Sequence, residues 1–177
     1  MTATRSLSMA CTTVLLAATA LKAQRPAAAV RSFRDTTVTV SGTGMDQLNT
    51  AVVHFKDSTA AGMREQSTEI VQLMGDLEGR VLYSVTTVIN FTHGTLVNTG
   101  DEVYSGTVAG SAPVMLHDDK FRFDANLVTG AEAGKVYLVD HVAGPRVTCL
   151  LDVIGTGMTP DGNPTFSYTG RCAFGHD

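Results

Sequence analysis

The chain contains no tryptophan, and only 17% of its 177 residues are charged. Coiled coils and disordered chains carry far more charge than this, so the composition argues against both. There is no excess of positive charge either: the formal net charge is −4, which argues against nucleic acid as a partner. The chain is instead rich in β-branched residues, with 24 Thr and 20 Val. These residues favour strands and argue against a helical bundle.

The first residues have the pattern of a secretory signal peptide. Arg5 supplies a positive charge, and residues 7–21 form a nearly uncharged run of apolar and small residues, too short for a permanent membrane helix. Ala23 is a small residue suited to cleavage, so we predict that residues 1–23 are removed. Removal takes away Arg5 and Lys22 but no acid, so the net charge falls from −4 to −6.

The rest of the chain predicts one exported domain. We interpret residues 24–35 as a flexible lead-in and residues 36–177 as a single domain. No apolar stretch after residue 30 approaches the roughly 20 residues that a membrane helix needs. We therefore expect a soluble, secreted or periplasmic protein, with no membrane insertion after signal cleavage and no nucleic-acid partner.

Short runs with strand composition recur along residues 36–177, and Gly, Pro, Asn or Asp stands in almost every gap. Only residues 45–49 and 58–64 leave room for a helical turn. The pattern predicts nine strands, at residues 36–42, 50–56, 64–74, 79–92, 95–108, 114–128, 135–143, 147–155 and 165–174.

Alternation within these runs indicates strands with one buried face. Phe121, Phe123 and Ala125 share one face of their strand, while Arg122 and Asp124 share the other. Eight or nine such strands with short links predict an all-β fold. We expect an antiparallel up-and-down β-barrel of about eight strands, with a β-sandwich as the alternative.

Two cysteines remain after the predicted cleavage, Cys149 and Cys172. Residues 159–163 (Thr-Pro-Asp-Gly-Asn) between them are typical of a tight turn. A hairpin centred on this turn pairs residues whose numbers add to 321, which places the two cysteines opposite each other. We predict a disulfide, with two free buried thiols as the alternative. No His or Cys lies near either one at zinc-binding spacing, so we predict no metal.

A second hairpin turns at residues 93–94. A two-residue loop there would pair Tyr83 with Tyr104 and Val85 with Glu102. If the apolar face of the first strand is interior, the polar residues of its partner on that face are interior too. A β-bulge in this hairpin would reverse the assignment.

Later strands carry further polar residues on their apolar faces. An eight-stranded barrel can hold one small ligand, in a site that is mostly apolar with a few polar groups. The predicted ligand-binding residues are Tyr83, Asn98, Glu102, Tyr104, His117, Phe121, Phe123 and Tyr168.

No residue is assigned a catalytic role, but three are candidates. Glu102 and Tyr104 could polarise a bound carbonyl, and Asp140, on an apolar face, could be a general acid of raised pKa. The alternatives are an exposed Glu102 on a strand edge and an Asp140 at the wet end of its strand. His117 and Asp119 share a face but lack a third metal ligand. No nucleophile elbow, phosphate loop or dinucleotide motif is present, so no cofactor is expected.

Three glycine-containing segments carry a resemblance to a known family. They are Gly-Asp-Leu-Glu-Gly at 75–79, Tyr-Ser-Gly-Thr-Val-Ala-Gly at 104–110, and Thr-Gly-Ala-Glu-Ala-Gly at 129–134. Together they resemble barrels of the allene oxide cyclase and dirigent type, over less than half of the chain. The resemblance implies a barrel that binds a hydrophobic, oxygenated small molecule and steers its cyclisation or coupling. It assigns no catalytic residue.

Three hypotheses for function follow. The first is an exported barrel that binds a small hydrophobic molecule without catalysis. The second is a cyclase or isomerase acting inside the barrel, and the third is a structural or interaction protein with a filled barrel. An open apolar cavity would favour the first, an open cavity with a buried carboxylate the second, and a solid interior the third.

Overall fold

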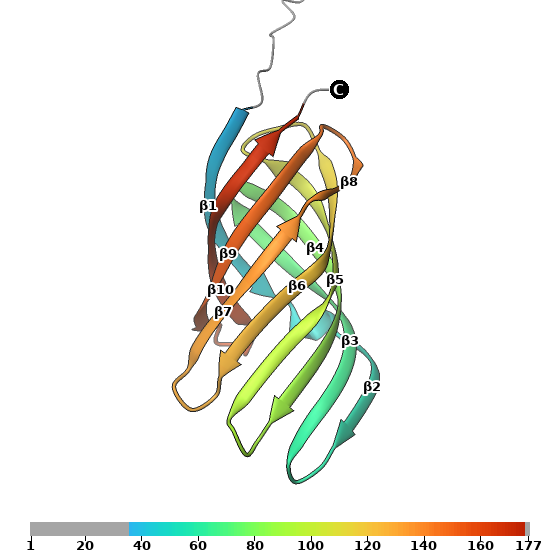
Figure 1. Ribbon diagram of the computed structural model, residues 1–177, viewed down its shortest axis with the longest axis vertical. Coiled ribbons are helices and arrows are strands. Elements are labelled where there is room, and N and C mark those ends of the chain that lie inside the picture. Colours follow the sequence, from blue (N-terminus) through green and yellow to red (C-terminus); the bar gives the residue numbers. More distant parts are fainter. Residues whose placement is uncertain (1–35, 176–177) are drawn as a thin grey trace, which may run out of the picture. The chain divides into compact units, whose positions relative to one another are not determined.

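The computed structural model describes residues 36–175, which form a closed antiparallel β-barrel (Figure 1). Eight strands follow one another around the barrel in the order β1-β10-β9-β7-β6-β5-β4-β3, and β3 closes it by pairing with β1. Two further strands are attached, β2 to β3 and β8 to β6. The prediction of an all-β barrel of about eight strands is therefore confirmed, and the sandwich alternative is wrong. The predicted signal peptide and lead-in, residues 1–35, lie outside the described residues.

The elements have the following bounds: β1 Thr36–Asp46, a short 3-10 helix η1 Leu48–Thr50, β2 Val52–Ser58, β3 Gly62–Gly75, β4 Leu77–Asn90, β5 Thr95–Val108, β6 Val114–Asn126, β7 Ala131–Leu138, β8 Asp140–Ala143, β9 Val147–Met158 and β10 Pro164–Phe174. No helix among the described residues is long and apolar enough to cross a membrane.

Two of the predicted strands differ clearly from the observed ones. The strand predicted at 36–42 continues to Asp46, because its last residues pair with the end of β3 as well as with β10. The strand predicted at 135–143 is two strands, β7 and β8, separated by Val139. The Val139 N–H donates to the Tyr137 carbonyl at 2.7 Å, which bends the chain between the two strands.

The β9–β10 hairpin has the predicted register. Cys149 lies opposite Cys172, and their sulfur atoms form the predicted disulfide. Next to the turn the pairing is shifted by one residue, since Met158 pairs with Pro164 and their numbers add to 322. A β-bulge between Thr165 and Phe166 absorbs the extra residue and restores the register over the rest of the hairpin.

The predicted register of the β4–β5 hairpin is wrong by two residues. Its loop contains four residues, not two, so Tyr83 lies opposite Glu102 instead of Tyr104. The Asn90 side chain accepts the backbone N–H of His93 at 3.0 Å and stabilises the longer turn. A shift of two residues leaves every side chain on the same face, so the predicted interior face of β5 is unchanged.

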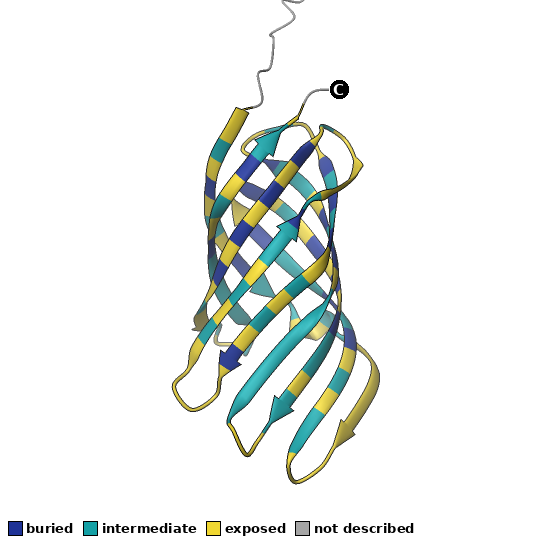
Figure 2. Ribbon diagram, in the orientation of Figure 1, coloured by how far each residue is buried: buried dark blue, intermediate teal, exposed yellow. Residues whose placement is uncertain are grey.

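One end of the barrel is filled with side chains. This filled end is formed by the start of β1, the end of β10 and the β3–β4, β5–β6 and β8–β9 connections (Figure 1). Buried residues alternate along the strands that reach it (Figure 2). Its fully buried side chains include Leu77, Leu116, Leu138, Val147 and the two cysteines.

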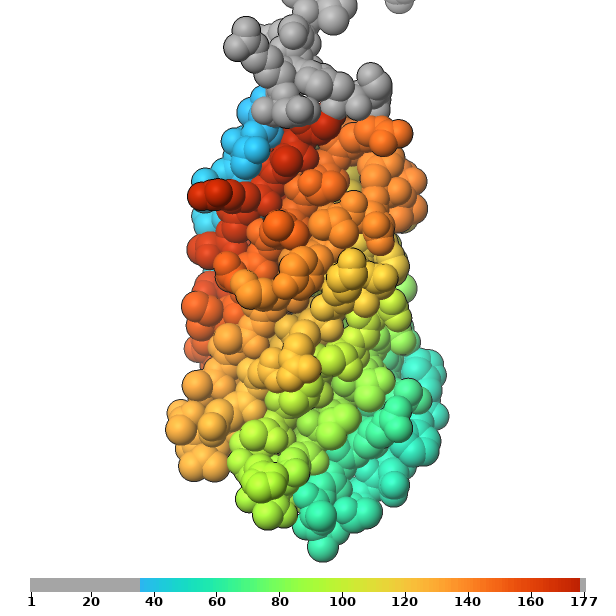
Figure 3. All heavy atoms as spheres, in the orientation of Figure 1, coloured from blue at the N-terminus to red at the C-terminus, as the bar shows by residue number. Residues whose placement is uncertain are grey.

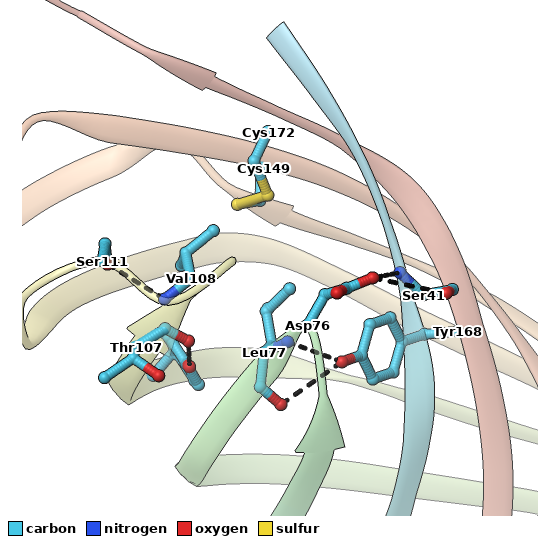
Figure 4. The surroundings of a disulfide bond; sticks show 10 residues. Ser41, Asp76, Leu77, Thr107, Val108, Ser111, Cys149, Tyr168 and Cys172 are labelled. Carbon is cyan, nitrogen blue, oxygen red and sulfur yellow. Dashed lines mark hydrogen bonds between the residues drawn. A yellow bond between two sulfur atoms is a disulfide. The ribbon is translucent and has the colours of Figure 1, made fainter. Parts of the chain in front are cut away.

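Two tyrosines on β5 and β10 tie this core to the backbone. The Leu77 N–H donates to the hydroxyl oxygen of Tyr168 at 2.8 Å (Figure 4). The Tyr104 hydroxyl donates to the Thr107 carbonyl at 2.5 Å. Both rings are almost completely buried. These hydrogen bonds satisfy the polar ends of the rings and fix the strand ends around the disulfide.

The opposite end is built from longer hairpins. The β2–β3 and β4–β5 hairpins reach further than the β6–β7 hairpin there (Figure 3). Half-exposed apolar side chains lie on these hairpins, among them Phe91 and Leu127. The interior of this end, which we call the open end, is not filled, and it contains the candidate site.

Candidate functional site

A cavity of about 200 Å³ lies inside the open end of the barrel. Its walls are mainly apolar and come from all eight strands of the barrel, with β1 contributing its last residue, Asp46. Leu127 lines the cavity and is also 50% exposed, so it marks the mouth. The apolar walls include Val71, Val81, Phe121, Phe123, Val153 and Phe166.

Three polar residues in the cavity wall each carry an unpaired oxygen. The atoms are Asp46 Oδ1, Asn98 Oδ1 and Glu102 Oε1. Among residues 36–175, no other buried side-chain nitrogen or oxygen atom lacks a hydrogen-bond partner. All three residues line this one cavity. Buried polar atoms are almost always paired, so three unpaired atoms in one wall need an explanation.

Asp46 belongs to a chain of hydrogen bonds between β1, β3 and β4. The Tyr83 hydroxyl lies 2.7 Å from Asp46 Oδ2 and 2.9 Å from Glu69 Oε2. The Ser67 hydroxyl donates to the other oxygen of Glu69. The phenol has only one proton, so it can donate to only one of the two carboxyl groups at a time.

The close approach of Asp46, Glu69 and Tyr83 changes the pKa values of Asp46 and Tyr83. The pKa of Asp46 is raised to about 7: burial has the largest effect and raises it, the hydrogen bond from Tyr83 lowers it, and the charge of Glu69 raises it. Burial, followed by the two neighbouring carboxylates, also raises the pKa of Tyr83, so the phenol stays protonated. The arrangement therefore holds an exchangeable proton at the cavity wall near neutral pH.

Glu102 is a second carboxyl group in the cavity wall with a raised pKa. It is 5% exposed and lies between Tyr83 of β4 and Asp118 of β6 in the barrel wall. The pKa of Glu102 is raised to about 8, mainly by burial and also by the negative charge of Asp118. Asp118 itself accepts the backbone N–H groups of Lys120 and Tyr137, at 2.6 and 2.5 Å. Only Glu102 of this pair therefore has an unpaired oxygen.

Six of the eight predicted ligand-binding residues line the cavity: Tyr83, Asn98, Glu102, Phe121, Phe123 and Tyr168. The hydroxyl of Tyr168 is already bonded to the β3–β4 connection, so only its ring is available to a ligand. Tyr104 does not line the cavity, and its hydroxyl is bonded to backbone carbonyls in the filled end.

His117 does not face the interior as predicted. Its ring lies 3.5 Å from Asp140 Oδ2 and 3.9 Å from Asp101 Oδ1, and both of these carboxyl groups are well exposed. The reason is a β-bulge in β6 between Asp118 and Phe121, opposite Asp101. The bulge changes which residues face inward, so Phe121 and Asp118 are both interior although their numbers differ in parity.

Asp140 is also outside the cavity. Its side chain is 59% exposed, because the bend at Val139 separates it from the buried face of β7. The alternative prediction, a solvent-exposed Asp140, is therefore the one observed. Asp140 and His117 form a surface pair with Asp101, and neither residue can act on a molecule inside the barrel.

Asp46, Ser67 and Glu69 were not predicted as site residues. Asp46 was missed because the predicted strand ended at residue 42, although Val40, Gly42, Gly44 and Asp46 continue one alternating face. Ser67 and Glu69 share a face of β3 with Val71 and Leu73. Polar residues on an apolar strand face were the available signal.

Comparisons of the chain with models of known protein families, with curated protein sequences and with solved structures found no match.

Proposed function

We propose that this protein binds a small, mainly apolar molecule that carries hydrogen-bond donors, in the cavity of the open end. The observation that carries the proposal is the set of three unpaired oxygens, on Asp46, Asn98 and Glu102, in the wall of one apolar cavity. A buried polar group without a partner costs about 1–3 kcal/mol. A ligand that donates hydrogen bonds to these groups would remove that cost, and its apolar body would fill the space.

The volume limits the size of this ligand. The cavity of about 200 Å³ is somewhat larger than an apolar cavity of about 150 Å³ that accepts benzene. A single ring with a short polar substituent fits such a space. The rings of Phe121, Phe123 and Phe166 in the wall provide contacts for its apolar part.

The test uses 2-phenylethanol as a neutral probe and two matched variants. Ala125 lines the cavity, so Ala125→Phe should fill it, while Ala133 is exposed on the neighbouring β7 and Ala133→Phe should leave it open. We expect saturable binding to the wild type and to Ala133→Phe by ligand-observed NMR, and its loss in Ala125→Phe. Absence of binding to the wild type, or equal binding to both variants, would overturn the proposal.

Acid–base catalysis is a second candidate, favoured by one specific observation. The raised pKa values of Asp46 and Glu102, about 7 and about 8, leave protonated carboxyl groups in the cavity wall near neutral pH. Such a group can donate a proton to a carbonyl oxygen, as an isomerase or cyclase requires. The experiment is conversion of 3-cyclohexenone to its conjugated isomer, followed by ultraviolet absorbance. Turnover that disappears in Glu102→Gln would support catalysis, and no conversion above the buffer rate would refute it for this probe class.

Export is part of the same proposal. The Cys149–Cys172 disulfide supports an oxidising compartment, since such bonds persist in secreted and periplasmic proteins. The intact mass of the protein purified from a bacterial periplasm tests this. We expect a chain that starts at Gln24 and is about two mass units lighter than its reduced form. An uncleaved chain with free thiols would overturn the export proposal.

The third hypothesis, a structural barrel with a solid interior, fits only the filled end, which holds this disulfide; the open end contains the cavity.

A further inference from the structure

We infer that the polar group of the ligand is a protonated amine, so that the cavity is a site for a small hydrophobic amine. This inference rests on the proposed function, because it names the chemical class of the molecule bound in the same cavity. It starts from the unpaired atoms: all three are oxygens that accept hydrogen bonds, on Asp46, Asn98 and Glu102. The complementary group on a ligand is therefore a donor.

The charges around the cavity favour a cation over a neutral donor. Three acidic residues line the cavity, Asp46, Glu102 and Glu132, and none of its lining residues is Lys, Arg or His. Two more carboxyl groups lie directly behind the wall: Glu69 shares the Tyr83 hydroxyl with Asp46, and Asp118 pairs with Glu102 across the strands. A negatively charged ligand would be repelled by this set, while an ammonium group would be attracted.

A basic residue on the strand next to β3 is already paired. Lys56 of β2 lies 2.6 Å from Glu65 of β3, and its side chain is 55% exposed. It therefore does not neutralise the carboxyl groups of the cavity. The neighbouring acids on the outer surface have cations of their own, as in the Arg122–Asp124 and Lys135–Asp152 pairs. Within residues 36–175, no salt bridge joins a Lys or Arg side chain to Asp46, Glu69, Glu102 or Asp118.

An ammonium group also fits the donor requirement better than a hydroxyl group. It has three N–H donors and a positive charge, whereas a hydroxyl has one donor hydrogen. Hydrogen bonds between an ammonium and a carboxylate are about twice as strong as neutral ones. The unpaired atoms of Asp46 and Glu102 are both carboxyl oxygens, which accept hydrogen bonds from such a group. Asn98 lies four residues from Glu102 along β5, roughly 13 Å at the rise of a strand, and is placed for a second donor on the ligand.

The binding of an amine should depend on pH in a defined direction. Asp46 faces Tyr83 and Glu69, Glu102 faces Tyr83 and Asp118, and Glu132 of β7 also lines the cavity. The phenol stays protonated because its pKa is raised. As the pH rises through about 7 to 8, the two cavity carboxyl groups lose their protons and the attraction for an ammonium group increases. A neutral ligand gains nothing from this change.

The experiment compares three probes of one shape by calorimetry at pH 6 and pH 8.5: phenethylamine, 2-phenylethanol and phenylacetate. We expect phenethylamine to bind the wild type at least about tenfold more tightly than the alcohol at pH 8.5, a difference that corresponds to about 1.4 kcal/mol. Its affinity should be weaker at pH 6. Phenylacetate should bind most weakly of the three.

Two variants and one control locate the effect. Glu102→Gln and Asp46→Asn should each weaken phenethylamine about tenfold, and they should weaken 2-phenylethanol clearly less, because the amide keeps an oxygen that accepts the hydroxyl but carries no negative charge. Retained binding of the alcohol shows that each variant still has its cavity. Asp101→Asn is the matched control, because Asp101 precedes Glu102 on β5 but its side chain is 67% exposed outside the barrel. It should change neither affinity.

The outcomes separate this inference from the proposed function. If the alcohol binds and the amine binds no better, or if phenylacetate binds best, the cavity is a ligand site and the inference of an amine is wrong. The inference also fails if Asp101→Asn weakens the amine as much as Glu102→Gln does. If none of the three probes binds the wild type, the proposed function itself fails and the inference fails with it.

Discussion

The substitution Glu102→Gln should make the protein less sensitive to alkaline pH. In the barrel the pKa of Glu102 is raised to about 8 from an ordinary value of 4.5, because the carboxyl group is buried and lies beside Asp118. The folded protein therefore holds a proton on Glu102 that the unfolded chain releases. Between about pH 4.5 and pH 8 the unfolded state binds fewer protons, so the free energy of unfolding falls as the pH rises.

The size of the effect follows from the same two values. At about 1.4 kcal/mol per pH unit, the difference corresponds to about 5 kcal/mol between fully protonated and fully ionised Glu102. Water that enters the cavity would solvate the carboxylate, so this figure is an upper bound. Glutamine has nearly the same shape as protonated glutamate and does not titrate. The stability of Glu102→Gln should be close to that of the wild type at pH 5 and higher by several kcal/mol at pH 9.

Urea denaturation at pH 5, 7 and 9, followed by tyrosine fluorescence or circular dichroism, measures this difference. Asp101→Asn removes an exposed carboxyl group from the adjacent position and should follow the wild type at every pH. Asp46 titrates in the same direction, so Glu102→Gln should keep part of the pH dependence. Parallel curves for the wild type and Glu102→Gln from pH 5 to pH 9 would show that Glu102 ionises normally, and the argument from its burial would be refuted.

Three further predictions concern the rest of the barrel. Replacing both Cys149 and Cys172 by Ala should lower the free energy of unfolding by about 3 kcal/mol, since the bond closes a loop across a separation of 23 residues; an unchanged urea midpoint would contradict this. Gly42→Ala should destabilise the protein by about 1–3 kcal/mol, because a Cβ at that position would lie 2.3 Å from the tyrosine hydroxyl of β10, whereas Thr43→Ala on the outer face should have little effect in the same thermal melts. Tyr83→Phe should raise the pKa of Asp46 above about 7, since it removes the hydrogen bond that lowers that pKa. NMR titration of the carboxyl carbon of Asp46 measures this, and an unchanged pKa would disprove it.

The fold was largely predictable because its signals are local. Alternating faces, turn residues and the symmetry about residues 159–163 were enough to place most strands and to pair Cys149 with Cys172. The β4–β5 register was not predictable from the His93-Gly94 pair, because the side chain of Asn90 stabilises a longer loop. The faces survived this error only because the shift was an even number of residues.

The site was less predictable because it depends on irregularities. The bulge between Asp118 and Phe121 turned His117 outward, and no residue type in that run marks a bulge. The bend at Val139 likewise exposed Asp140. Asp46 reaches Tyr83 only because β1 continues past its predicted end and closes the barrel against β3, which is a tertiary contact that local pattern does not contain.

The division of the barrel into a filled end and an open end has a consequence for how such a protein can change over time. The disulfide and the buried tyrosine hydrogen bonds lie at one end, while the cavity and its hairpins lie at the other. Apart from Tyr168, whose ring lines the cavity, substitutions at the cavity wall therefore leave the disulfide and these hydrogen bonds intact. Descendants of one ancestral barrel could exchange one ligand for another without first losing a stable fold.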